Sequence, residues 1–296
     1  MRILITGGTG LVGQALIKVL QPQHDIVVLT RNVGRASTVL PGIELTSNLD
    51  DIDFNRLDAV INLAGEPIAE RRWSEAQKQR ICDSRWLLTE AIASKILAAT
   101  TPPHLLLNAS AVGFYGRQDH GPLDENYPGF YPEFSHDVCA KWENLANRAR
   151  SEHTRVAIVR IGIVLSADGG ALAKMLPAFR LGLGGPISDG QQYMSWIHID
   201  DLVGLFVHLL EHPDSNGVYH GTAPMAVTNE QFSKLLAKRL NRPAFFRVPA
   251  FMLRLMFGEM ADLLLFGQQV YPQRVLDSGY SYKYPQCRQA FEALPL

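Results

Sequence analysis

The chain has 296 residues, of which 47% are hydrophobic, and a formal net charge of −1. This length can bury a large core, as one big domain or as a large domain plus a small one. The near-zero charge argues against a nucleic-acid partner, because phosphate contacts favour a basic face, and no apolar run reaches the ~18 uncharged residues of a membrane span.

The first two-thirds of the chain alternates short β-branched runs with helical stretches. Five runs are nearly continuously apolar and of strand length, as a sheet covered on both faces requires. The predicted strands are 2–6, 25–30, 58–63, 104–110 and 155–162, and helical patterns between them include 11–20 and 74–99. This alternation predicts an α/β fold built on a doubly wound parallel sheet.

After about residue 165 the predicted strands thin out, and glycine- and proline-rich loops and further helices take over. Thr228 begins one of these helices, because Gln231 lies at its third position and completes a capping-box pattern. Asp200 or Asp201 is expected to cap the helix that follows them.

The first predicted strand runs directly into a glycine-rich turn with the spacing GxxGxxG. Gly7 permits the tight turn, Gly10 lets the backbone approach a pyrophosphate, and Gly13 lets the following helix pack on the strand. The N-terminus of that helix offers unpaired N–H groups to the phosphates. The alternative is a tight turn with incidental glycines. The cofactor-binding residues expected here are Gly7, Thr9, Gly10, Leu11, Val12 and Gly13.

The end of the second predicted strand selects the cofactor. An NAD site would carry an Asp or Glu there to bind the ribose 2′-hydroxyl, but this chain has Thr30, Arg31 and Asn32. Arg31 can stack on adenine and pair with a 2′-phosphate. We therefore predict NADP(H) rather than NAD, with Thr30 and Arg31 among its contacts; the alternative for Arg31 is a solvated charge at a strand end.

Motifs along essentially the whole chain resemble the extended short-chain dehydrogenase/reductases. "TGGTGLVG" at 6–13 matches their glycine motif, and "NASAVGFYG" at 108–116 looks like their serine strand. "NLAGEPI", "LPAFRLGLGGPI" and a C-terminal module at 247–296 resemble the YfcH-like epimerase family within this superfamily. The resemblance implies an NADP-binding Rossmann domain at 1–165 plus about 194–225, and a smaller, mostly helical substrate-side region at about 166–193 and 226–296.

The resemblance also implies roles for individual residues. Ser110 matches the serine that hydrogen-bonds substrate or bound water, and Lys141 matches the lysine that binds the nicotinamide ribose. Arg85 could reach a cofactor phosphate or be a solvated helix arginine, and Glu66 could face the cofactor cleft or be an ordinary loop carboxylate. The residues expected to line the cofactor, at the end of the family's fourth strand, are Leu63, Ala64 and Gly65.

The helix that carries Lys141 lacks the tyrosine of the superfamily's Tyr-x-x-x-Lys pair. Counting back four residues gives Asp137, which beside an ammonium is a carboxylate with no proton to give at pH 7. We expect Asp137 and Lys141 to form an ion pair instead. Three other groups could supply a proton: Tyr115, on the loop after the serine strand, then His136 and Cys139. Tyr115 is the candidate retained, although the default interpretation of a tyrosine there is a wall of the cleft.

Two functions follow from these patterns. The resemblance implies an NADP(H)-dependent epimerase, dehydratase or reductase acting on a small hydroxylated or carbonyl substrate, such as a sugar nucleotide. The absent tyrosine favours the alternative, an NADP(H)-dependent sensor or regulator without turnover, since some relatives are linked to cell division. The glycine-rich loop 180–201 is expected to contact the substrate through Gln191, Gln192 and Tyr193.

The remaining expectations concern metals, partners and compartment. The three cysteines, Cys82, Cys139 and Cys287, are isolated, so the sequence predicts neither a disulfide framework nor a zinc site. We expect no metal, a small-molecule substrate, no nucleic-acid or membrane partner, and a monomer or homodimer in the cytoplasm.

Overall fold

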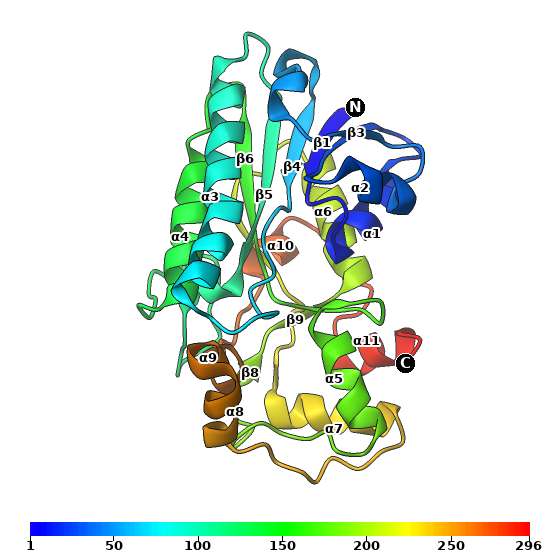
Figure 1. Ribbon diagram of the computed structural model, residues 1–296, viewed down its shortest axis with the longest axis vertical. Coiled ribbons are helices and arrows are strands. Elements are labelled where there is room, and N and C mark those ends of the chain that lie inside the picture. The colour runs from blue at the N-terminus through cyan, green and yellow to red at the C-terminus, as the bar shows by residue number, and fades with distance from the viewer.

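Seven parallel strands form the centre of the protein, whose computed structural model describes residues 1–296 (Figure 1). Their order is β10-β6-β5-β4-β1-β2-β3. They are β1 (Arg2–Thr6), β2 (Asp25–Leu29), β3 (Glu44–Thr46), β4 (Ala59–Asn62), β5 (Leu105–Ala111), β6 (Arg155–Ile161) and β10 (Gly217–Gly221). The order reverses between β1 and β4, which confirms the predicted doubly wound α/β sheet and marks the edge where such sheets bind ligands.

All five predicted strands are present, each within one residue of its predicted ends. The two edge strands, β3 and β10, were not predicted. β3 has the sequence ELT, and β10 has the sequence GVYHG, with two glycines and a histidine. Neither run has the continuous apolar pattern that identifies the five central strands.

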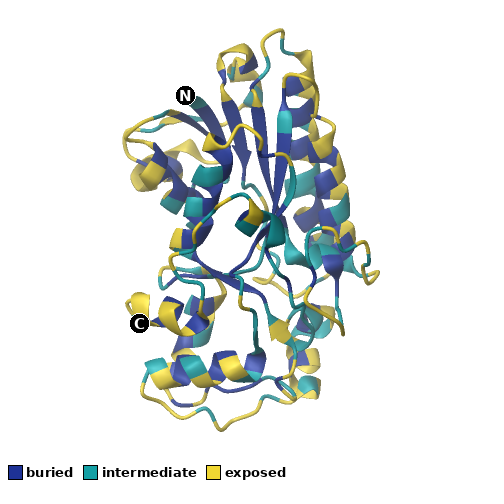
Figure 2. Ribbon diagram, turned by 180° about the vertical axis from the view of Figure 1, so that it is seen from behind, coloured by how far each residue is buried: buried dark blue, intermediate teal, exposed yellow.

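Helices cover both faces of the sheet, and Figure 2 shows buried residues running along the strands between them. α1 (Leu11–Leu20) and α6 (Ile199–Glu211) cover one face; α3 (Glu75–Ala98) and α4 (Phe134–Asn147) cover the other. Ile3 and Ile5 of β1 pack with the α1 side, whereas Leu4 packs with the α3 side. Burying each such side chain contributes about 1.5–3 kcal/mol. No helix combines the length and apolar character that crossing a membrane requires.

A smaller, mostly helical region lies below the sheet in Figure 1. Its elements are β7 (Ile163–Leu165), α5 (Gly170–Arg180), β8 (Tyr193–Met194), β9 (Trp196–His198), β11 (Val227–Thr228), α7 (Asn229–Arg239), α8 (Ala250–Phe257), α9 (Asp262–Leu265) and α11 (Cys287–Ala293), whereas α10 (Gln273–Asp277) packs on the sheet beside β10. Trp196, Phe232 and Phe291 belong to a separate core there. Thr228 and Gln231 form the predicted capping box at the start of α7.

The C-terminal segment returns from the smaller region to the sheet. The backbone N–H groups of Lys283 and Tyr284 donate to the Asp201 carboxylate at 2.7 and 2.9 Å. The Tyr280 hydroxyl donates to the Asp201 carbonyl at 2.9 Å. The buried Asp201 therefore joins this segment to α6.

The prediction that Asp200 or Asp201 caps α6 is wrong. The N-cap residue is His198, whose Nδ1 accepts the Asp200 N–H at 3.1 Å. Because the helix begins at Ile199, earlier than expected, both aspartates lie in its first turn. There they still favour the helix dipole, and Asp201 is available to hold the C-terminal segment.

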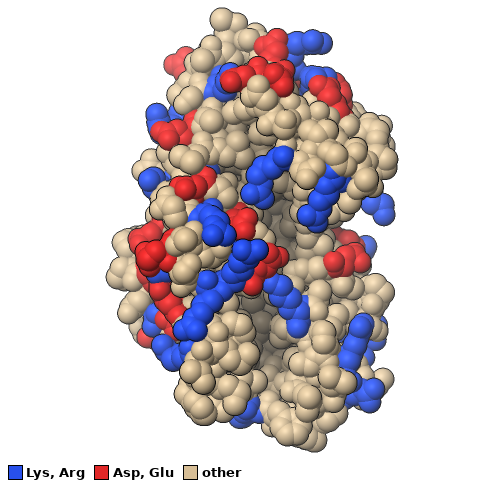
Figure 3. Space-filling model, viewed as in Figure 1, with Lys and Arg blue, Asp and Glu red and all other residues tan.

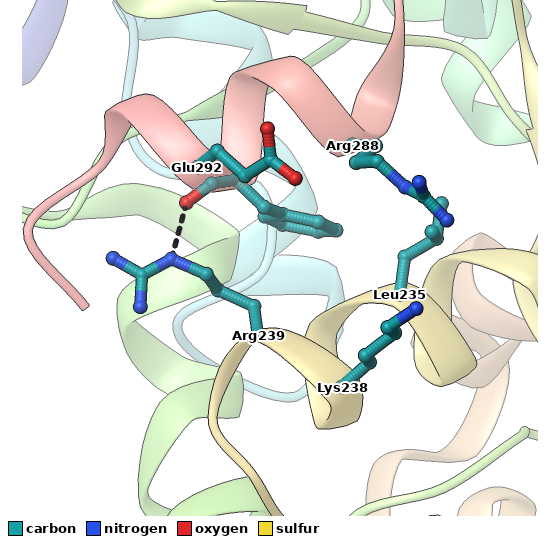
Figure 4. A pocket seen from close by; sticks show the side chains of 6 residues that line it. Leu235, Lys238, Arg239, Arg288 and Glu292 are labelled. Carbon is teal, nitrogen blue, oxygen red and sulfur yellow. Dashed lines mark hydrogen bonds between the residues drawn. The ribbon is translucent and has the colours of Figure 1, made fainter.

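A cavity of about 230 Å³ lies between α7 and α11 (Figure 4). Its basic side chains include Arg239, whose guanidinium donates to the carbonyls of Phe291 and Leu294 at 2.9 and 3.0 Å. These carbonyls belong to the C-terminal end of α11, so Arg239 stabilises that helix end. None of the predicted site residues lines this cavity.

Candidate functional site

The glycine loop between β1 and α1 lies at the point where the strand order reverses. Gly7 has φ 71°, and a Cβ there would lie 2.6 Å from the Leu63 carbonyl. A Cβ on Gly13 would lie 2.4 Å from the Gly7 carbonyl oxygen. Gly10 is exposed, and its Cβ would meet only that same oxygen, at 3.2 Å. Gly7 therefore allows the tight turn, and Gly13 allows the helix to pack closely on it. At Gly10 the backbone is left accessible to a ligand.

The N-terminus of α1 is free to bind an anion. It has no side-chain cap and no acidic residue in its first turn. The N–H groups of Leu11, Val12 and Gly13 therefore have no partner within the helix, and the positive end of the helix dipole lies beside them. Thr9 precedes them, and its carbonyl accepts from the Gln14 side chain at 2.8 Å. This end of the helix fits a phosphate group.

Two arginines stand at the end of β2. The Arg31 side chain is 91% exposed, and its Nη2 lies 3.9 Å from Glu66 Oε2. Asn32, which follows Thr30 and Arg31, caps α2 (Val33–Val39) by accepting the Arg35 N–H at 2.9 Å. The Arg35 side chain is exposed and forms no ion pair. Lys and Arg side chains gather along the hollow in the middle of this face (Figure 3), and two arginines at β2 suit a 2′-phosphate.

The loop after β4, which contains Leu63, Ala64 and Gly65, is held in place from α3. Ser84 Oγ accepts the Glu66 N–H at 2.9 Å, and Arg85 Nη1 donates to the Glu66 carbonyl at 3.0 Å. A Cβ on Gly65 would lie 2.8 Å from Arg85 Cζ. Burial lowers the pKa of Arg85. Arg85 is therefore a packed support of the cleft wall, and the alternative of a solvated helix arginine is wrong.

Ser110, near the end of β5, is bonded to α4 through Glu143. Its hydroxyl donates to Glu143 Oε1 at 2.7 Å, and Arg160 donates to both carboxylate oxygens at 2.9 and 2.8 Å. Cys139, one turn earlier on α4, also contacts Ser110, and burial raises the pKa of its thiol to about 11. The two α4 positions, four residues apart, that face Ser110 are therefore Cys139 and Glu143.

Lys141 does not face Ser110. Its side chain is exposed, and Nζ lies 4.1 Å from the centre of the Trp86 ring on α3. It follows Cys139 by two residues, which places it about 200° further round the helix. Asp137 lines a surface cavity of about 430 Å³ with Trp86 among its other residues. The expected Asp137–Lys141 ion pair is not formed, and the structure separates both residues from the serine.

Tyr115, the retained candidate for a proton donor, is fully buried and faces β10. Its hydroxyl accepts from Arg160 Nη1 at 2.8 Å and lies 2.7 Å from His220 Nε2. Burial raises the pKa of Tyr115 to about 12. This contradicts the prediction, because the hydroxyl is sealed within the protein. His136, another candidate, is bonded through Nδ1 to the Phe114 carbonyl at 2.6 Å.

The three residues of loop 180–201 that were expected to contact a substrate have different environments. Tyr193 is exposed on β8, and the Gln191 backbone N–H is bonded to Asp189 at 3.0 Å. Gln192 Nε2 donates to the carbonyls of Ile187 and Leu264 at 3.3 and 2.9 Å. Gln192 therefore connects this loop to α9, a role for which the sequence carried no signal.

The hydrogen bonds around Tyr115 have a fixed direction. Burial lowers the pKa of His220 to about 4, so its ring is neutral at pH 7. His220 Nδ1 lies 2.9 Å from the Tyr271 carbonyl, which can only accept, so Nδ1 carries the proton. Nε2 then accepts from Tyr115, whose hydroxyl also donates to the Asp124 carbonyl at 3.2 Å, and the Tyr115 oxygen accepts from Arg160. Sequence reasoning missed Glu143, Arg160 and His220 because they lie on three separate elements.

Two family models match the chain. Residues 3–221 match the NAD dependent epimerase/dehydratase family, and residues 248–294 match a domain of unknown function, DUF1731. The chain belongs to the NAD dependent epimerase/dehydratase family. The mouse epimerase family protein SDR39U1 is 40% identical over 99% of both chains. The chloroplastic SDR39U1 homologue of Arabidopsis thaliana is 38% identical over 99% of this chain and 86% of its own length.

Solved structures agree with this assignment. The crystal structure of human SDR39U1 with NADPH has a TM-score of 0.91 and 38% identity, covering 99% of this chain and 98% of the human chain. The UDP-glucuronic acid 4-epimerase of Bacillus cereus, in complex with UDP-glucuronic acid and NAD, has a TM-score of 0.78 at 16% identity, covering 99% of this chain and 97% of its own. The second likeness shows the fold alone. The predicted family resemblance and the Rossmann-type fold are confirmed.

This family member differs from the expected Tyr-x-x-x-Lys pattern in both residues of the pair. The α4 residues directed at β5 and the loop after it are Ser135, Cys139 and Glu143, spaced by four. Neither a tyrosine nor a lysine is among them. The signal that could have revealed this register was the spacing of these three residues, which places them on one helix face.

Proposed function

We propose that this protein binds NADP(H) at the carboxyl edge of its sheet and acts as an NADP(H)-dependent sensor, without the tyrosine-dependent chemistry of epimerases. One observation carries this proposal: the α4 face opposite Ser110 holds Cys139 and Glu143 in place of a tyrosine and a lysine, and the Cys139 thiol, which keeps its proton at pH 7, is buried. The NADPH bound to human SDR39U1 supports the choice of cofactor.

The residues at the cleft fit a dinucleotide phosphate. The backbone of Gly7–Gly13 is open at Gly10, and the uncapped α1 would hold the pyrophosphate. Arg31 and Arg35 would hold a 2′-phosphate, since both side chains are exposed just after β2 and Arg31 is paired only with Glu66, at 3.9 Å. Leu63, Ala64 and Gly65 would form the adjoining wall. A bound nicotinamide supplies a hydride donor or acceptor.

The hydrogen bonds of Ser110 argue against turnover. A carbonyl that receives a hydride also needs a proton, and a carbonyl bound at Ser110 needs a hydrogen-bond donor. The Ser110 hydroxyl hydrogen is already donated to Glu143, whose carboxylate is held by Arg160. Ser110 can therefore only accept from a ligand. This arrangement supports cofactor binding without reduction.

Titrating the purified protein with NADPH tests the binding half of the proposal. Incubation of the complex with a panel of carbonyl compounds and sugar nucleotides, followed by NADPH absorbance and product analysis, tests the other half. We expect saturable NADPH binding and no consumption above the protein-free rate. Consumption that saturates with one panel member would overturn the sensor proposal.

A second candidate is an NADP(H)-dependent epimerase, dehydratase or reductase of a small hydroxylated or carbonyl substrate. The observation that favours it is the contact between the two regions beside the cleft, where Lys174 Nζ of α5 donates to the Ala69 carbonyl at 3.2 Å. Such a contact can enclose a substrate. Turnover that disappears in Ser110→Ala, with NADPH affinity retained, would select this function.

A further inference from the structure

We propose that Glu66 sets how strongly this chain discriminates NADP(H) from NAD(H). The inference rests on the proposed binding of NADP(H) and goes beyond it by assigning the discrimination to one carboxylate. The acid that an NAD site carries at the end of its second strand is absent from β2. In this fold a carboxylate from the loop after β4, that of Glu66, lies 3.9 Å from the Arg31 guanidinium instead.

The sheet order explains how Glu66 reaches this place. β2 and β4 are the two neighbours of β1, so their carboxyl ends lie on either side of the glycine loop. Arg31 follows β2 and Glu66 follows β4, and their charged groups approach to 3.9 Å across that loop. Arg31 has no other ion-pair partner.

The backbone that carries the Glu66 side chain is held in place by α3. Its backbone N–H is bonded to Ser84 Oγ at 2.9 Å, and its carbonyl is bonded to Arg85 Nη1 at 3.0 Å. Its side chain is 23% exposed, whereas that of Arg31 is 91% exposed. The carboxylate is therefore the more buried member of the pair, on an anchored stretch of backbone, and the exposed arginine is the member free to move toward a ligand.

The two cofactors would use this pair differently. The 2′-phosphate of NADP(H) competes with Glu66 for Arg31 and is repelled by the Glu66 charge. The 2′-hydroxyl of NAD(H) can instead donate to the Glu66 carboxylate while Arg31 remains paired. Both effects reduce the preference for NADP(H). The difference in affinity between NADP(H) and NAD(H) is therefore smaller than it would be with Arg31 and no Glu66.

Dissociation constants of NADPH and NADH for the wild-type chain, Glu66→Gln and Glu70→Gln test the proposal by calorimetry. Glu70 is an exposed carboxylate of the same loop with no ion pair, so it is a matched control for the loss of one charge. We expect Glu66→Gln to bind NADPH more tightly and NADH more weakly, raising the affinity ratio at least about tenfold. Glu70→Gln should change that ratio by less than about twofold.

The outcomes separate this proposal from the proposed function. If the wild-type chain binds neither dinucleotide, NADP(H) binding itself fails. If it binds NADPH but Glu66→Gln leaves the ratio within about threefold or lowers NADPH affinity, Glu66 merely anchors Arg31 and the proposal is overturned. Melting curves verify that each variant folds. If Glu66→Gln does not fold, Glu66→Asp, which keeps the charge on a shorter side chain, is compared with the wild type instead. A ratio that shifts toward NADPH in Glu66→Asp supports the proposal, and an unchanged ratio overturns it.

Discussion

A single hydroxyl hydrogen decides what Ser110 can do. The Ser110 hydroxyl donates its hydrogen bond to the Glu143 carboxylate, which also accepts from Arg160. A ligand group at Ser110 must therefore be a donor. The same serine beside a tyrosine and a lysine could donate instead. The chemistry of the site is therefore set by the neighbours of Ser110, and the residue type alone does not define it.

Removing the Glu143 charge should destabilise the protein much more than removing the Lys141 charge. Glu143→Gln leaves the buried Arg160 guanidinium without its carboxylate and should lower the free energy of unfolding by about 3 kcal/mol. Lys141→Ala removes an exposed side chain and should change it by less than about 1 kcal/mol. Denaturant unfolding checks both values. A large loss of NADPH affinity in Lys141→Ala would contradict the placement of Lys141 outside the cofactor site.

Because of His220, the free energy of unfolding should fall at acidic pH. Its pKa is 6.5 in the unfolded chain and about 4 in the folded protein, because the ring is buried. Its contribution is fully present above pH 6.5 and is lost as the pH falls toward 4, since the unfolded chain then binds the extra proton. The loss should reach about 3 kcal/mol. Urea unfolding of the wild type and His220→Gln at several pH values checks this, and equal slopes would contradict it.

At the scale of elements, different glycines of the glycine loop serve stability and cofactor binding. Gly13→Ala places a Cβ 2.4 Å from the Gly7 carbonyl, so it should destabilise the protein by about 1–3 kcal/mol. Gly10→Ala meets only one atom, at 3.2 Å, so it should preserve the melting temperature while weakening NADPH binding about tenfold. Calorimetry and thermal melts distinguish the two, and unchanged affinity in Gly10→Ala would contradict the open-backbone role.

Elements defined by local patterns could be predicted, and those defined by distant partners could not. The five central strands followed from apolar runs, and the glycine loop followed from spacing. The orientation of α4 could not be predicted, because the family pattern points to Lys141, whereas the buried Glu143 is paired with Arg160 on β6 and bonded to Ser110 on β5. The pairing of Arg31 with Glu66 was hidden for the same reason, since it joins the ends of two strands that are far apart in sequence.

At the scale of the whole molecule, Asp201 fastens the C-terminal segment to the sheet domain. Asp201→Ala removes the acceptor for two backbone N–H groups and should lower the free energy of unfolding by about 3 kcal/mol. Asp200→Ala, at a half-exposed neighbour paired with Lys283, should cost less than about 1 kcal/mol. Limited proteolysis should cut the 280–284 segment faster in Asp201→Ala alone; equal rates in both variants would contradict the fastening role.

The two regions meet around the hollow where a ligand would be enclosed, and the proposed sensor differs from an enzyme in what happens there. Hydride transfer can be followed without knowing the substrate, by incubating the protein with NADPH deuterated at nicotinamide C4 and an extract of small metabolites. We predict that the bound cofactor keeps its deuterium in the wild type and in Ser110→Ala alike. Deuterium that moves into a metabolite with the wild type, and stays on the cofactor with Ser110→Ala, would contradict the absence of turnover.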